Sequence, residues 1–202
     1  MDHQTEKLLR HRHPALLPSS LSIDTDNGWF FILDALCGLL DSQEGAGETT
    51  VRVSQIKEKF GELRFYTDGH SGRQDGSAEF AEALSGRICE ACGMPGSLRG
   101  RNWVVTLCDR HAAKSGKPDD VTLLHEPDDV TLPPNPAGTE GYHPSLVQAA
   151  IELEFFCRNG NAPVFSLGDD GRQRVSVDGD VPENVLGAID LFLALQPPET
   201  EN

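Results

Sequence analysis

Three cysteines and one histidine lie close together in the middle of the chain, at the spacing that metal sites use. The segment CEACGMPGSLRGRNWVVTLCDRH covers residues 89–111 and contains Cys89, Cys92, Cys108 and His111. Two residues separate the members of each pair, so both members can reach one ion, and thiolates together with imidazole nitrogen bind zinc tetrahedrally. The spacing therefore predicts a zinc site made of these four residues.

The number of ligands indicates what the zinc would do. Catalytic zinc usually keeps three protein ligands and an open position for water, whereas four protein ligands close the site. Glu90 is the one glutamate inside the segment, and its place in a knuckle turn would direct it away from the ion. We expect a structural zinc ion, with catalytic zinc and ordinary buried thiols as the alternatives.

The residues around the two pairs predict how the ligands are held. Gly93 permits a tight turn after the first pair, and residues 97–107 can form a hairpin that turns near Arg99 and Gly100. The segment CDRHAAKSG, which starts at Cys108, has the composition of a helix start. A knuckle, a hairpin and then a helix is the order of a treble-clef zinc domain.

Helices and strands are expected before the knuckle. Apolar residues at helical spacing predict a helix over 27–42, with Asp26 or Asn27 as its N-cap. Alternating apolar residues on either side of Gly61 predict an antiparallel pair of strands near 50–57 and 62–67. A further helix over 77–88 would deliver the chain to Cys89.

The composition changes after the knuckle, which suggests a domain boundary. Residues 116–141 are acidic and rich in proline, contain PDDVTL twice, and are expected to form an extended linker. Residues 142–202 read as helix, strand, tight turn, strand and helix. We therefore expect an α+β protein with a zinc-stabilised, treble-clef-like domain over 1–115 and a small α-β-β-α domain over 142–202.

Few other residues suggest chemistry. Cys37 and Cys157 lie on apolar helix faces and are expected to be buried free thiols, while His11 and His13 are expected to be solvated near the terminus. The sequence shows no phosphate-binding loop, dinucleotide-binding turn, nucleophile elbow or zinc-protease motif. This favours a protein that is not an enzyme, although an active site assembled from distant residues stays open.

The charge balance indicates the class of partner. Lys and Arg total 17 against 32 for Asp and Glu, a formal net charge of -15. Such a charge disfavours nucleic acid and anionic membranes and favours a basic partner. Because no apolar run approaches the roughly 18 residues of a membrane span, and no signal peptide is recognisable, a soluble cytoplasmic protein is expected.

Four segments in this order resemble a group of bacterial and prophage-encoded zinc-knuckle proteins that share a domain of unknown function. These are GWFFILDAL, VSQIKEKFGELRFY, FAEALSGRICEACGMPGSLR and NWVVTLCDRH, within residues 27–115. The resemblance implies a knuckle whose last ligand is Cys or His, here His111. It implies no biochemical role.

The acidic charge favours a zinc-stabilised immunity or antitoxin-type protein that neutralises a basic bacterial toxin. Acidic side chains near the ends of the two C-terminal strands are the expected docking residues: Asp169, Asp170, Asp178, Asp180 and Glu183. The alternative is a phage or prophage accessory protein that contacts nucleic acid through basic residues near the knuckle: Arg87, Arg99, Arg101 and Arg110.

Overall fold

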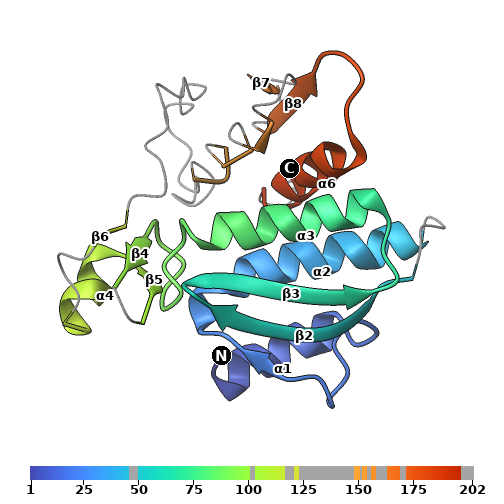
Figure 1. The fold of residues 1–202 in the computed structure, drawn as a ribbon. Coiled ribbons are helices and arrows are strands. Elements are labelled where there is room, and N and C mark those ends of the chain that lie inside the picture. The colour runs from blue at the N-terminus through green and yellow to red at the C-terminus, as the bar shows by residue number, and fades with distance from the viewer. Residues whose placement is uncertain are drawn as a thin grey trace.

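The computed structural model describes residues 1–45, 50–100, 103–116, 121–122, 148–150, 152–153, 156–157, 163–168 and 172–196. The fold is α+β, with helices packed against small sheets (Figure 1). The helices are α1 His3–Arg12, α2 Phe30–Gly45, α3 Gly72–Ser85, α4 Asp109–Lys114 and α6 Glu183–Ala194, and a 3₁₀ turn, Asn27–Trp29, leads into α2. The strands are β1 Ile23–Asp24, β2 Arg52–Lys59, β3 Glu62–Asp68, β4 Ser97–Arg99, β5 Val105–Leu107, β6 Val121–Thr122, β7 Pro163–Leu167 and β8 Gln173–Val177.

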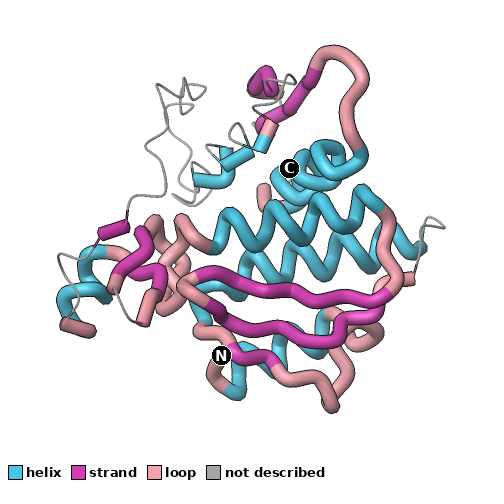
Figure 2. The backbone as a smooth tube through the Cα atoms, in the orientation of Figure 1, coloured by secondary structure: helices cyan, strands magenta, loops and turns pink. Residues whose placement is uncertain are grey.

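The largest sheet has the order β1-β2-β3 (Figure 2). β2 and β3 form the antiparallel pair that the alternating pattern predicted, and β1 adds a short parallel pairing in which Ile23 lies opposite Ile56. Alternate residues of the strands are buried, which gives the sheet one apolar face: Val53, Ile56, Leu63 and Phe65. Helices α2 and α3 run side by side along this sheet (Figure 1).

Helix α3 begins at Gly72, five residues before the start expected from the sequence. Ser71 and Gln74 form a capping box, in which each side chain bonds the other residue's backbone N–H. This cap satisfies two backbone donors that a helix start leaves without intrahelical partners. The glycine-rich composition of this stretch hid the cap, because glycine usually indicates a loop.

The expectation of a solvated N-terminal segment is wrong for His13. Residues His3–Arg12 form α1, capped by the Asp2 side chain, and His13 is only 7% exposed at the helix's C-terminal end. Its Nδ1 lies 2.8 Å from Asp41 and its Nε2 lies 3.1 Å from Asp34, two carboxylates on α2. His13 therefore fastens α1 to α2 rather than facing solvent.

Helix α6 crosses α3 at very short range because both helices carry a glycine at the crossing. A Cβ atom at Gly187 would overlap the carbonyl oxygen of Arg73, and one at Gly76 would overlap the backbone of Asn184. The Ser77 hydroxyl donates to the Gly187 carbonyl oxygen over 2.9 Å. Beside this contact, Arg73 forms a two-bond ion pair with Asp190.

The C-terminal elements share the hydrophobic core of the N-terminal helices. Leu191 and Phe192 of α6 belong to the same buried cluster as the sheet and α2, and Phe156 meets Phe80 edge to face at 6.2 Å. β7 and β8 pair antiparallel, as the predicted strand, turn and strand require. The apolar face of α6 is buried against α3, so the described C-terminal elements and the N-terminal helices share one core. The expected division into domains at residues 115 and 142 stays a prediction.

The segment expected to be a linker, residues 116–141, lies mostly outside the described residues. Val121 and Thr122 are described, and they pair antiparallel with Leu98 and Arg99 of β4. The strand β6 thus extends the hairpin beside the knuckle. Within the described parts of the chain, every helix is too short or too polar to cross a bilayer.

Candidate metal centre

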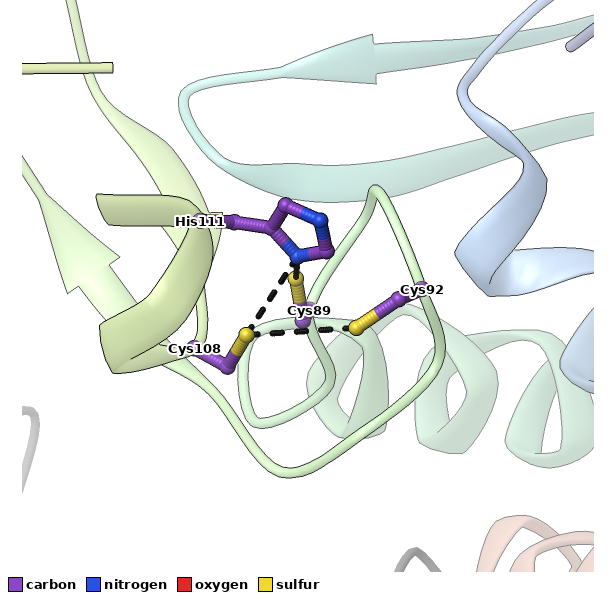
Figure 3. Close-up of side chains that lie close together, drawn as sticks. All are labelled: Cys89, Cys92, Cys108 and His111. Carbon is purple, nitrogen blue, oxygen red and sulfur yellow. Dashed lines mark hydrogen bonds between the residues drawn. The ribbon is translucent and has the colours of Figure 1, made fainter. Parts of the chain in front are cut away.

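Four side chains predicted to bind metal converge at one point (Figure 3). Their ligand atoms all lie within 4.8 Å of one another. His111 Nδ1 lies 3.4 Å from the sulfur of Cys89 and 3.3 Å from that of Cys108, and the sulfurs of Cys92 and Cys108 are 3.9 Å apart. Tetrahedral zinc with the usual bond lengths needs ligand separations of about 3.5–3.8 Å. Cys89, Cys92, Cys108 and His111 could therefore hold one metal ion.

Backbone hydrogen bonds shape the knuckle that carries the first two ligands. The N–H groups of Cys92 and Gly93 donate to the Cys89 carbonyl over 3.2 and 2.8 Å, and the Cys89 N–H donates to the Met94 carbonyl over 2.7 Å. Gly93 has a φ of 76°, a conformation that glycine adopts without strain. The turn thus directs Cys89 and Cys92 toward the same point.

The other two ligands come from the start of α4. Cys108 occupies the position before the helix and His111 lies in its first turn, where the His111 N–H donates to the Cys108 carbonyl over 3.0 Å. Strands β4 and β5 form the predicted hairpin between the two ligand pairs, with Leu98 opposite Thr106. The expected order of knuckle, hairpin and helix is therefore present.

The knuckle is packed directly onto the start of α2. The Gly28 N–H donates to the Glu90 carbonyl over 2.6 Å, and a Cβ atom at Gly28 would overlap the Cys89 carbonyl oxygen. The buried Trp29 indole donates to the Ile88 carbonyl over 2.9 Å. Gly28 and Trp29 thus form the surface against which the knuckle packs. This role was not predicted from the sequence.

The turn between β2 and β3 is packed onto the metal hairpin. The Thr106 hydroxyl donates to the Gly61 carbonyl over 2.6 Å, and the Thr106 carbonyl accepts from the Glu90 N–H over 2.9 Å. A Cβ atom at Gly61 would overlap Leu98. Thr106 therefore connects the sheet, the hairpin and the knuckle, and no sequence motif identified it.

The environment of the thiols differs within the cluster. Burial raises the pKa of Cys89 to about 11. For Cys108, burial acts in the same direction, but the N–H of His111 and hydrogen bonds from the neighbouring thiols outweigh it and lower the pKa. Because zinc binds thiolates, metal binding here must displace protons, and the affinity should rise with pH.

Glu90 is buried in the knuckle but is not one of the four residues whose ligand atoms converge. It is 8% exposed, and burial raises its pKa to about 7. Its Oε1 accepts from the Asp26 N–H over 3.2 Å. This arrangement suits a structural contact between the knuckle and the segment before α2, rather than a general base for a metal-bound water.

An open cavity of about 720 Å³ lies beside the cluster, between the knuckle, the hairpin and α4. Cys108 lines its wall together with Arg99 and Arg110. The cluster can therefore be reached from solvent on the Cys108 side, while Cys89 is buried on the other.

The other predicted residues lie in four different situations. Asp178, Asp180 and Glu183 are exposed at the end of β8 and the start of α6, whereas Asp169, Asp170 and Arg101 lie outside the described residues. Arg87 pairs with the buried Glu152, and Arg99 pairs with Asp109. Arg110 is exposed on α4. Cys37 and Cys157 are buried free thiols, as predicted.

Comparison with known proteins adds no name to this site. No family model matches the chain, and neither a curated protein nor a solved structure matches it. The resemblance drawn from the four sequence segments therefore stays a prediction.

Proposed function

We propose that the chain is a zinc-stabilised, non-enzymatic binding protein whose ion holds a treble-clef arrangement together. The convergence of four protein ligands carries this proposal, since four ligands leave no position for a reacting water. The cluster also joins elements that are distant in sequence: the start of α2 through Gly28 and the β2–β3 turn through Gly61. A zinc ion here would stabilise the fold rather than catalyse a reaction.

The uneven distribution of charge supports a basic partner for the C-terminal part. Residues 116–202 contain 16 of the 32 acidic residues but only four of the 17 basic ones, whereas residues 1–115 contain 16 acidic and 13 basic residues. A concentrated negative charge accelerates association with a positively charged protein. A toxin that acts on nucleic acid must be basic, so an immunity-type role in a bacterial cell fits this charge.

Docking is proposed at the acidic loop ends of the C-terminal strands. Asp178, Asp180 and Glu183 are exposed there. Val177 pairs with Pro163 at the start of β7, so Asp178 lies at the end of the strand pair away from the connection between β7 and β8. Asp169 and Asp170 belong to that connection in the sequence and lie outside the described residues. The competing explanation is an acidic surface that only keeps the protein soluble.

A kinetic experiment distinguishes docking from solubility. The full-length protein is co-expressed with the product of a neighbouring toxin gene, and the association rate is measured at two salt concentrations. Charge reversal to Lys at Asp169, Asp170 and Asp180 should lower the association rate by about tenfold or more if these residues steer the partner. Reversal at Asp24, Asp68 and Glu79, which changes the net charge equally, is the control. Equal rates for the two variants would place the interface elsewhere.

The second candidate is a phage or prophage accessory protein that contacts nucleic acid beside the zinc site. The exposed side chain of Arg110 favours it. Arg87 and Arg99 are occupied by Glu152 and Asp109. A mobility-shift assay with nucleic acid at low salt tests this candidate. If the Arg110→Gln variant binds nucleic acid as tightly as wild type does, Arg110 does not contact it.

A further inference from the structure

The turn between β2 and β3 holds an aromatic residue in a conformation that its side chain disfavours. Phe60 has a φ of 58°, and among the described residues it is the one non-glycine residue with a positive φ. Asn, Asp and Gly are the usual residues at such a turn position, because bulkier side chains are strained there. Phe60 is also 69% exposed, so burial does not offset the strain. Strain of this kind at an exposed site indicates a role other than folding.

A second exposed aromatic residue lies at the neighbouring hairpin tip. Trp103, just before β5, is 70% exposed. The two tips adjoin, because the Cβ position at Gly61 lies 3.3 Å from the side chain of Val104, and Thr106 donates to the Gly61 carbonyl. Phe60 and Trp103 are the sequence neighbours of Gly61 and Val104, so two exposed aromatic residues lie in adjoining hairpin tips.

Lysines alternate with aromatic rings along this edge. Lys59 Nζ lies 5.3 Å from the centre of the Phe60 ring, and Lys57 Nζ lies 5.2 Å from the centre of the Tyr66 ring. Tyr66 is 40% exposed. The alternation of the strands places these side chains on the face opposite the buried Ile56 and Phe65, with Lys57 opposite Arg64. Acidic residues share this face, because Asp24 lies beside Lys57 and Glu62 lies opposite Lys59 and pairs with Arg64. Lys57 and Lys59, each beside an aromatic ring, supply the positive charge of the edge.

We propose that this aromatic edge binds single-stranded nucleic acid, a function beyond the proposed docking of a basic protein. The edge consists of Phe60, Tyr66, Trp103, Lys57 and Lys59. Unpaired bases stack on exposed aromatic rings while nearby cations attract the phosphates, and this combination needs no sequence-specific contact. The net charge of -15 disfavours nucleic acid overall, but residues 1–115, which hold this edge, are close to balanced, with 13 basic and 16 acidic residues.

Phe60→Asn separates binding from folding. Asparagine tolerates a positive φ, so the variant should melt at the same temperature as wild type or higher, while it lacks a ring for stacking. The probe is a fluorescein-labelled 15-nucleotide oligothymidylate, titrated with full-length zinc-loaded protein at low salt. Phe60→Asn and Trp103→Ala should each weaken binding by about fivefold or more. Leu8→Ser, which removes an exposed apolar side chain from α1, is the control and should bind as wild type does.

Substitution of the lysines tests the phosphate contacts. The double variant of Lys57→Gln and Lys59→Gln should reduce the salt dependence of binding by a slope of about 1, whereas Lys7→Gln with Lys114→Gln makes the same change of net charge elsewhere and should leave it unchanged. Wild-type affinity for the Phe60→Asn variant would overturn the proposal. So would equal affinity for a duplex of the same length, in which the bases are not free to stack. Binding of a labelled polyglutamate peptide in place of the oligonucleotide would assign the edge to acidic proteins instead.

Discussion

The metal-bearing region and the C-terminal region of this protein are held in place by different kinds of contact. Around the knuckle, backbone groups of Gly28 and Gly61 fit against the hairpin and the ligand turn at hydrogen-bonding distance. The C-terminal helix α6 packs closely along α3, with Gly187 at the crossing, and side chains of α3 bond it: Ser77 donates to the Gly187 carbonyl and Arg73 pairs with Asp190. If the four ligands hold zinc as proposed, we expect the first region to depend on the ion and the second region to depend on the first. Variants that act on one region only can test this difference.

Removal of one ligand should have the largest effect and should reach both regions. Cys108→Ser leaves three ligands, and the binding free energy of a structural zinc ion is folding free energy, so we expect a loss of several kcal/mol. Because α3 leads into the knuckle and also carries α6, both regions should lose amide protection in hydrogen exchange. Cys157→Ala removes a buried thiol that is not a ligand and should cost about 1 kcal/mol. Retention of a folded α6 in Cys108→Ser would show that the C-terminal region folds alone.

Loss of the ion pair that links the regions should have the next largest effect. Arg87, two residues after the end of α3, pairs with Glu152, whose side chain is 7% exposed. Arg87→Ala leaves that buried carboxylate uncompensated and should cost about 3 kcal/mol in denaturant unfolding. The double variant with Glu152→Gln should recover part of the loss. Without any recovery, Arg87 would act through its packing rather than through the charge pair.

A methyl group at the helix crossing should disturb the C-terminal region selectively. Gly187→Ala forces α6 away from the Arg73 carbonyl and should cost about 2 kcal/mol, with the zinc content unchanged. Gly38→Ala in α2 is the matched control, since the nearest atom to a Cβ there lies 3.6 Å away on His13. That variant should gain up to about 1 kcal/mol from helix propensity. Equal melting temperatures for the two variants would contradict the close crossing.

The smallest expected effect is a pH dependence at the boundary of the sheet and α3. Burial raises the pKa of Glu82 above its ordinary value of 4.5, although the Phe65 N–H and Arg64 oppose the shift. The folded protein therefore binds this proton more tightly than the unfolded chain, and the contribution of Glu82 to stability falls as the pH rises above 4.5. Glu82→Gln keeps the acceptor for Phe65 and should stabilise the protein more at pH 7 than at pH 4. A stabilisation independent of pH would contradict the raised pKa.

The sequence predicted those parts of the fold that depend on patterns of residues close together in the chain. The four ligands are visible because two pairs at a spacing of two residues rarely occur by chance, and the hairpin between them follows from strand composition around Gly100. The pair of β2 and β3 follows from alternation around Gly61. In each case, the residues that decide the structure lie within about 20 positions of one another.

The parts that the sequence did not predict depend on contacts between distant residues. His13 is buried because Asp34 and Asp41, seven residues apart on one helix face, bond its two ring nitrogens. Gly187 lies within a helix, where glycine is normally unfavourable. It is needed there because only a residue without a side chain leaves room for the backbone of α3. The composition of α6 does not reveal that this helix packs against α3. The acidic, proline-rich composition of residues 116–141 therefore suggested two domains, although α6 shares the core of the N-terminal helices.

Elemental analysis of protein purified without added metal tests the central claim most directly. The account predicts one zinc ion per chain for wild type and far less than one for Cys92→Ser, with the released ion detected by a chromogenic chelator after thiol modification. It also predicts that chelation lowers the melting temperature, and that added zinc restores it. A fully folded wild-type protein that contains no stoichiometric metal and whose melting temperature does not respond to zinc would contradict a zinc-stabilised fold.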